Sequence, residues 1–162
     1  MLFRSKEGKC IRFNENDVRA TGRDTMGVRG MDIGADDVLV DMAVIKPDCE
    51  VITMTENGYG KRSDLEDYRL QSRSGKGIKA GVFTEKTGKL VSLKLVSEDE
   101  DLMIISENGT IIKVASSDIS KIGRATQGVK VMRIEDSRVS RLAITPKSEE
   151  DDEDVEDTET QE

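Results

Sequence analysis

The chain has 162 residues and a formal net charge of −8, with 25 Lys or Arg, 33 Asp or Glu and no histidine. Ten acidic residues and no basic ones fall in 148–162, so the remainder holds 25 basic and 23 acidic residues, a net charge of +2. Two cysteines without histidine make no recognisable metal site, and no run approaches the roughly 20 apolar residues that span a bilayer. We expect a reduced cytoplasmic protein, with a Cys10–Cys49 disulfide as the alternative.

The sequence repeats itself three times with a period of about 50 residues. The first repeat starts at Leu2-Phe3, turns at Glu7-Gly8 and continues in an apolar strand, Cys10–Phe13. The turn recurs as Asn57-Gly58 and Asn108-Gly109, so its glycines are 50 and 51 residues apart. Asn-Gly indicates a tight hairpin because both of its residues take a positive φ. Strands flanking the later turns are expected at Val51–Met54, Gly60–Arg62, Leu102–Ile105 and Ile111–Val114.

Each repeat then runs through a polar stretch and a glycine-rich loop to two further strands. We expect third strands at Val28–Ile33, Ile78–Phe83 and Val129–Ile134, and fourth strands at Val38–Ile45, Leu90–Val96 and Val139–Ile144. Short strands rich in β-branched residues and separated by turns favour antiparallel β-structure. The pattern predicts an all-β fold of propeller-like, four-stranded blades at about 1–47, 48–98 and 99–147, followed by a disordered acidic tail at 148–162.

Three blades are too few to close a wheel, since propellers usually have four to eight. The open face of each repeat also needs a neighbour to bury it. Either two chains close the wheel together or the chain is the end of a longer protein. The abrupt start of the first repeat at Leu2-Phe3 favours the second interpretation.

Basic side chains recur in register with the repeat. One set follows the hairpin turn, a second lies in the glycine-rich loop and a third opens the third strand: Arg12, Arg62 and Lys113; Arg23, Arg73 and Arg124; Arg29, Lys79 and Lys130. Equivalent positions on a radial array lie at regular angular steps, so these charges would match the phosphates of a curved duplex. Phosphate contacts give affinity and position without direct sequence readout. Few aromatic residues are present, which disfavours stacking on single strands.

The densest motif is the loop Gln71-Ser72-Arg73-Ser74-Gly75-Lys76-Gly77. Its glycines allow close backbone approach, while Arg73 and Lys76 supply charge, and Gln71 joins them as a candidate contact. The loop lacks the first glycine and the final Ser or Thr of the nucleotide-binding P-loop, so nucleotide binding is not expected.

This loop resembles the Gln-Arg-Arg-Gly-Gly-Lys-Gly box in the C-terminal domain of DNA gyrase A, with departures at Ser72 and Ser74. The resemblance extends from Met1 to Thr145. The runs 21–30, 56–62 and 123–129 are similar to the last three blades of that domain, and the acidic tail is similar to its terminus.

The resemblance implies half of a six-bladed β-pinwheel, a domain that wraps duplex DNA around a basic perimeter and so supports ATP-dependent negative supercoiling. The full box lies in the family's first blade, whereas the loop at Gln71 belongs to a later one. The implied partners are double-stranded DNA, the breakage-reunion domain of gyrase A and the gyrase B subunit, in an A2B2 holoenzyme on the bacterial chromosome. The catalytic tyrosine, ATP and Mg²⁺ are then expected on other domains or subunits, with no cofactor in this chain.

Two other functions remain open. The chain is also similar to the corresponding domain in the A subunit of topoisomerase IV, and a propeller-like protein-interaction module would need no DNA. An enzyme is disfavoured because the sequence offers no nucleophile with a recognisable base, and Tyr59 and Tyr68 are expected to pack. The tail could be inert, mimic phosphate at the basic rim or bind another part of the enzyme; the resemblance favours autoregulation of wrapping.

Overall fold

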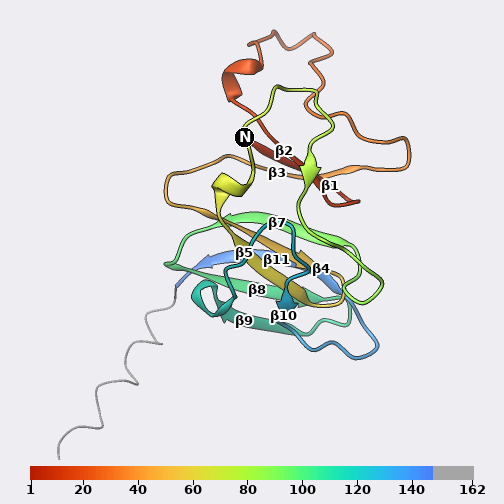
Figure 1. Ribbon diagram of the computed structural model, residues 1–162, viewed down its shortest axis with the longest axis vertical. Coiled ribbons are helices and arrows are strands. Elements are labelled where there is room, and N and C mark those ends of the chain that lie inside the picture. The colour runs from red at the N-terminus through yellow and green to blue at the C-terminus, as the bar shows by residue number, and fades with distance from the viewer. Residues whose placement is uncertain (148–162) are drawn as a thin grey trace, which may run out of the picture.

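The computed structural model describes residues 1–147, whose regular elements are antiparallel strands and three short 3-10 turns, joined by long loops (Figure 1). Each repeat begins with a hairpin: β1 (Leu2–Ser5) with β2 (Lys9–Arg12), β4 (Glu50–Thr55) with β5 (Tyr59–Ser63), and β8 (Glu100–Ser106) with β9 (Ile111–Ala115). A 3-10 turn follows each hairpin: η1 (Glu15–Asp17), η2 (Leu65–Asp67) and η3 (Ser116–Asp118). The all-β prediction is confirmed. The predicted tail, 148–162, lies outside the described residues.

The three hairpin turns form where the sequence predicts them, but their geometry differs from the prediction at one residue. Among residues 1–147, the residues other than glycine with a positive φ are Asp48, Ser74 and Asp136, so Asn57 and Asn108 do not take the positive φ expected of both Asn-Gly residues. Gly8, Gly58 and Gly109 have φ angles of 79°, 76° and 85°, in the left-handed region that residues with a Cβ rarely adopt. Within residues 1–147, no helix has the length and hydropathy needed to cross a membrane.

The fourth strand of each repeat pairs with the first strand of its own hairpin. These strands are β3 (Leu39–Ala43), β7 (Leu90–Val96) and β11 (Val139–Pro146). β7 contacts both β3 and β11, so the three fourth strands gather on one side, which we call the inner side. The opposite side of each sheet is therefore the outer edge.

The third strand of a repeat leaves its own hairpin and joins the sheet of the preceding repeat. β6 (Ile78–Lys79) pairs with β2, giving the order β3-β1-β2-β6, and β10 (Val129–Lys130) pairs with β5, giving β10-β5-β4-β7. The prediction that each repeat supplies all four strands of its own sheet is therefore wrong at the third strand. Both exchanged strands have two residues and are shorter than predicted.

The predicted strand Val28–Ile33 does not form. By the pattern of β6 and β10, it would need the outer edge of a repeat preceding the first, and residues 1–147 offer none. At the other end, the third sheet has only three described strands, in the order β11-β8-β9, so β9 is an outer edge with no further strand among residues 1–147.

The hydrophobic core lies between successive repeats. One buried cluster joins Ile52 of the second repeat to Ile104 of the third, and another joins Leu2 of the first to Tyr68 of the second. A smaller cluster surrounds Phe13, whose ring stacks on Phe3 with centroids 5.1 Å apart. Burial of Tyr68 confirms that it packs. Both cysteines are free, so the alternative of a disulfide is wrong.

Candidate nucleic-acid interface

The arginines that follow the hairpin turns hold the next repeat in place. Arg12 Nη1 donates to the carbonyl oxygens of Leu65 (3.0 Å) and Tyr68 (3.2 Å) around η2. Arg62 Nε donates to the carbonyl oxygen of Ile119 (2.8 Å) beside η3, while its Nη1 pairs with Glu50 at 2.8 Å. Their side chains are only 19% and 11% exposed. Both guanidinium groups thus serve the joint between repeats, and we do not retain them among the proposed phosphate contacts.

The arginines of the glycine-rich loops form a second joint, in the opposite direction along the chain. Arg73 donates to the carbonyl oxygens of Asp17 and Arg29, and Arg124 donates to those of Asp67 and Lys79. Each therefore clasps two backbone carbonyls of the preceding repeat. Both side chains are half-buried. Because hydrogen bonds to a charged donor are stronger than neutral ones, these contacts fix where each loop lies.

The loop 71–77 is packed against the first repeat. Ser74 Oγ donates to the carbonyl oxygen of Arg29 (2.8 Å), and the Gln71 backbone amide donates to that of Arg12 (2.8 Å). The side-chain nitrogen of Gln71 is buried, with no partner among residues 1–147. Lys76, by contrast, lies exposed. The structure thus divides the motif into residues that anchor the loop and one lysine that faces solvent.

Other predicted contacts have partners of their own. Lys113 pairs with the buried Asp101 at 2.9 Å, and Arg29 lies 3.5 Å from Asp32. Lys130 Nζ donates to the carbonyl oxygen of Asn57 (2.8 Å) and lies 4.9 Å from the centroid of the Tyr59 ring. Lys130 nevertheless remains exposed, on the outer-edge strand β10.

Three predicted residues remain free for a ligand. Arg23, Lys76 and Lys79 are exposed, and their side chains form no ion pair or hydrogen bond with any other residue of 1–147. Lys79 lies on the outer-edge strand β6, and Lys76 lies in the glycine-rich loop that leads into it. Arg23 lies in the corresponding loop of the first repeat, which joins no sheet among residues 1–147.

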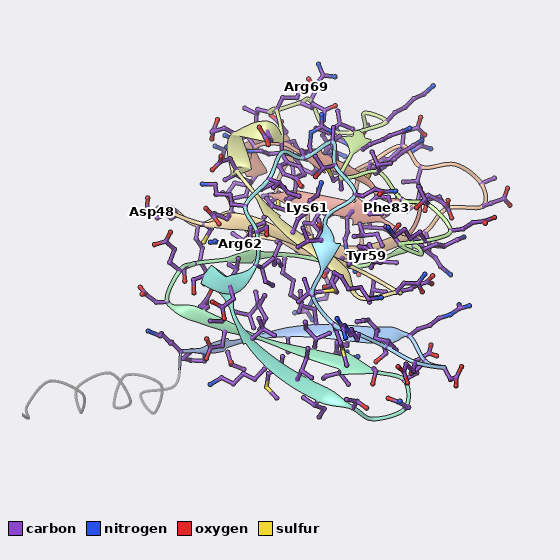
Figure 2. The ribbon with its side chains drawn as sticks, turned by 60° about the horizontal axis from the view of Figure 1, so that its bottom comes forward. Asp48, Tyr59, Lys61, Arg62, Arg69 and Phe83 are labelled. Atoms are coloured by element: carbon purple, nitrogen blue, oxygen red, sulfur yellow. The ribbon has the colours of Figure 1, made fainter. Side chains whose placement is uncertain are left out.

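The sequence analysis missed two exposed arginines, Arg19 and Arg69. They follow the 3-10 turns of the first and second repeats and are 50 residues apart, and Ser120 stands at the third position. In Figure 2, Arg69 points away from the ribbon at the top of the view. Their repeat spacing is the signal that could have identified them. With Arg23, Lys76, Lys79 and Lys130 they form what we call the outer rim.

A buried lysine, which the sequence analysis did not single out, binds backbone carbonyls of the third repeat's glycine-rich loop. Lys61 is 1% exposed, and its Nζ donates to the carbonyl oxygens of Gly123 (3.2 Å), Arg124 and Thr126 (2.9 Å). Burial, together with the nearby charge of Arg124, lowers the pKa of Lys61 from an ordinary 10.5 to about 8. The equivalent positions are Ile11 and Ile112, so this caged lysine is particular to the second repeat.

Known proteins share this architecture. A family model described as the DNA gyrase C-terminal domain, beta-propeller, matches residues 2–46, 50–97 and 100–146. The chain is 41% identical over 155 residues to the DNA gyrase A protein of Staphylococcus epidermidis, and 40% identical over 159 residues to that of Staphylococcus aureus. These alignments cover 94% and 97% of this chain but 17% and 18% of the relatives, so the chain spans under a fifth of their length.

Solved structures agree with the family match. A structure of the DNA gyrase A C-terminal domain is similar with a TM-score of 0.81 and 27% identity, covering 88% of this chain and 49% of that one. The C-terminal domain of DNA topoisomerase IV is similar with a TM-score of 0.82 and 20% identity, covering 90% of this chain and 46% of that one, which shows the shared fold. The chain belongs to the DNA gyrase C-terminal domain family.

Proposed function

We propose that this chain binds duplex DNA along its outer rim and forms part of the DNA-wrapping surface of gyrase A. The observation that carries the proposal is the recurrence of exposed basic side chains on the outer edge. Arg19 and Arg69 are equivalent in successive repeats, as are Lys79 and Lys130. Since phosphates along a duplex also recur, a curved row of cations could follow its backbone.

The joints between repeats support this proposal indirectly. Four arginine side chains donate hydrogen bonds to backbone carbonyls of neighbouring repeats: Arg12, Arg62, Arg73 and Arg124. Such contacts hold the rim in a fixed curve. Bending DNA costs elastic energy that contacts farther along the bend must offset, so a rigid arc of cations suits wrapping better than a flexible one.

The proposed role is non-catalytic. The chain would contribute DNA binding to a type II topoisomerase in the cytoplasm, on the bacterial chromosome. Strand breakage would belong to the breakage-reunion domain of gyrase A, and ATP hydrolysis with Mg²⁺ to the gyrase B subunit of an A2B2 holoenzyme. Relatives that carry the name of DNA gyrase A favour gyrase over topoisomerase IV, for which the likeness extends to the fold.

A salt titration of duplex binding tests the proposal. If five or six rim cations contact phosphates, the logarithm of the association constant should fall against the logarithm of salt concentration with a slope of about −4.5 to −5.5. Fluorescence anisotropy of a labelled duplex measures it. Binding that is absent at low salt, with the chain folded by circular dichroism, would contradict the proposal and favour a protein-interaction module.

The effect of the acidic segment 148–162 on DNA binding can be measured in the same experiment. Its ten carboxylates carry the charge of a phosphate row, so we propose that it competes with DNA for the rim. A chain ending at Lys147 should then bind the same duplex more tightly, with the largest gain at low salt. Equal affinity of the two chains would contradict competition by the tail while leaving DNA binding itself intact.

A further inference from the structure

A buried arginine lies where the first two repeats meet on the inner side. Arg4 is on β1, directly opposite Asp41 of β3, and its side chain is 5% exposed. Its Nη2 donates to the carbonyl oxygen of Val91, on β7 of the second repeat. Its Nε and Nη1 are buried and have no hydrogen-bond partner among residues 1–147, so most of the N–H donors of this guanidinium are unused.

The fold does not need a cation at this position. The equivalent residues of the second and third repeats are Met54 and Ile105, and Met54 is buried in the apolar core that joins those repeats. Burial of a charge is costly unless the charge is paired and hydrogen-bonded. Burial lowers the pKa of Arg4 from an ordinary 12.5 to about 10, although the nearby charge of Asp41 offsets part of this shift. Arg4 is therefore still a cation at neutral pH, and it lies at a position where an apolar residue would serve the fold.

Asp41 compensates the charge of Arg4 only in part. Its Oδ1 accepts a hydrogen bond from the backbone amide of Met42 (2.9 Å), and its Oδ2 lies 3.8 Å from Arg4 Nη2 and 3.6 Å from Lys94 Nζ. Both of these ion-pair distances are longer than a hydrogen bond. One carboxylate thus faces two cations and binds neither of them closely.

A cavity of 560 Å³ adjoins Arg4 and is lined by the inner strands of all three repeats, with β7 between β3 and β11 (Figure 1). Its charged lining residues are Arg4, Asp41, Lys94 and Arg141, so the lining has a net charge of +2. Arg141, on β11, is exposed, and its side chain forms no ion pair or hydrogen bond with the rest of residues 1–147. The cavity therefore offers two arginines in excess of the positive charge that Asp41 can balance.

This cavity is separate from the proposed DNA surface. It is lined by β1 and by the inner strands, and none of its lining residues belongs to the outer rim. The blades of a propeller surround a central channel, so a cavity between inner strands faces the axis of the wheel. DNA on the outer rim would leave such a cavity to a small molecule.

We propose that this cavity binds a small organic molecule through a phosphate group held between Arg4 and Arg141. The planar guanidinium matches the oxygens of a phosphate. A phosphate monoester carries a charge of about −1.5 to −2 at pH 7, which matches the excess of positive charge, whereas one carboxylate supplies less. The cavity has the size of ordinary ligand sites, and Val40 and Ile144 give it an apolar wall for the rest of the molecule. The proposal does not depend on DNA binding.

Calorimetric titration of the full chain tests the proposal, with inorganic phosphate and phenyl phosphate as the probes and sodium chloride holding the ionic strength constant. Both probes should bind saturably at one site. Phenyl phosphate should bind more tightly, because its ring can bury apolar surface against Val40 and Ile144. Arg4→Met should weaken the binding of phenyl phosphate at least about tenfold, since it removes a charged donor. Methionine occupies the equivalent position 54, so this variant should fold.

Two exposed arginines of the third repeat provide a second variant and its matched control. Arg141→Gln should also weaken the binding of phenyl phosphate, whereas Arg133→Gln, which removes the same charge outside the cavity, should leave it unchanged. Circular dichroism verifies that each variant is folded. The proposal would be overturned by the absence of saturable binding, by equal affinities of the full chain and Arg4→Met, or by phenyl phosphate binding no more tightly than inorganic phosphate. Displacement of phenyl phosphate by duplex DNA would also overturn it, because DNA would then be the source of the phosphate.

Discussion

Arg124 donates from Nε to the carbonyl oxygen of Asp67, 2.9 Å away, across the boundary between the third and second repeats. Arg73 makes the same contact with Asp17, at 3.2 Å, one repeat earlier. A basic residue that recurs with the repeat can therefore face the neighbouring repeat instead of a ligand. This distinction separates the positions that hold the wheel together from those that are free on its rim.

Arg62→Ala should destabilise the fold by about 2–3 kcal/mol, because it removes a charged donor from a partly buried joint and leaves the carbonyl of Ile119 without it. Urea unfolding followed by circular dichroism measures the change. Arg69→Ala is the control, since an exposed arginine without partners within 1–147 should shift the free energy of unfolding by less than about 0.5 kcal/mol. Equal effects of the two substitutions would contradict the assignment of Arg62 to the joint.

Reversing rim charges should weaken DNA binding and flatten its salt dependence. For Arg69→Glu and Lys79→Glu, each lost phosphate contact should reduce the log–log salt slope by about 0.9. Lys94→Gln is the control: Lys94 lies on the inner strand β7, 3.6 Å from Asp41, and its loss should leave the slope unchanged. A slope that responds to Lys94 but not to Arg69 would move the DNA site from the rim to the inner side.

The repeat and its hairpins could be predicted because their signals are local. Asn57-Gly58 and Asn108-Gly109 specify a turn through their own backbone preferences, and the turns set the period. The partner of a third strand could not be predicted in this way. Ile78-Lys79 is too short to show an alternating pattern, and whether it joins its own hairpin or the preceding one depends on how the repeats pack.

The basic residues show a second limit of prediction from sequence spacing. Arg12 and Arg62 recur in register, and the sequence analysis interpreted that register as a row of charges meeting a ligand. An interface between identical repeats imposes the same period, so spacing alone does not distinguish the two. Arg19 and Arg69 also recur with the repeat, and both are exposed. The equivalent residue of the third repeat is Ser120, so the basic residue is missing from one of the three positions, and the register is harder to recognise from sequence.

Gly58→Ala should cost more stability than Gly109→Ala. Both glycines have a positive φ, so an alanine at either site carries strain of about 1 kcal/mol. Only at Gly58 would the new Cβ meet another repeat, 2.3 Å from the carbonyl oxygen of Met132. We expect an additional loss of about 1–2 kcal/mol there as the third repeat shifts. Thermal unfolding compares the two variants, and equal losses of stability would mean that the third repeat relieves the close approach at Gly58 without cost.

Stability should rise with pH between about 8 and 10.5 because of Lys61. Its pKa is lowered by burial to about 8, while in the unfolded chain it returns to about 10.5. Within this window the unfolded state binds a proton that the folded state does not, so raising the pH favours folding. Below pH 8 the lysine is protonated in both states, and its contribution to the free energy of unfolding no longer varies.

Lys61→Ile isolates this contribution, since isoleucine occupies the equivalent positions 11 and 112. Between pH 8 and 10, the free energy of unfolding of the unsubstituted chain should increase relative to that of the variant by about 2 kcal/mol. Other groups that titrate in this range are common to both chains and cancel. A difference that stays constant with pH would show that the carbonyls of Gly123, Arg124 and Thr126 hold the ammonium well enough to offset its burial.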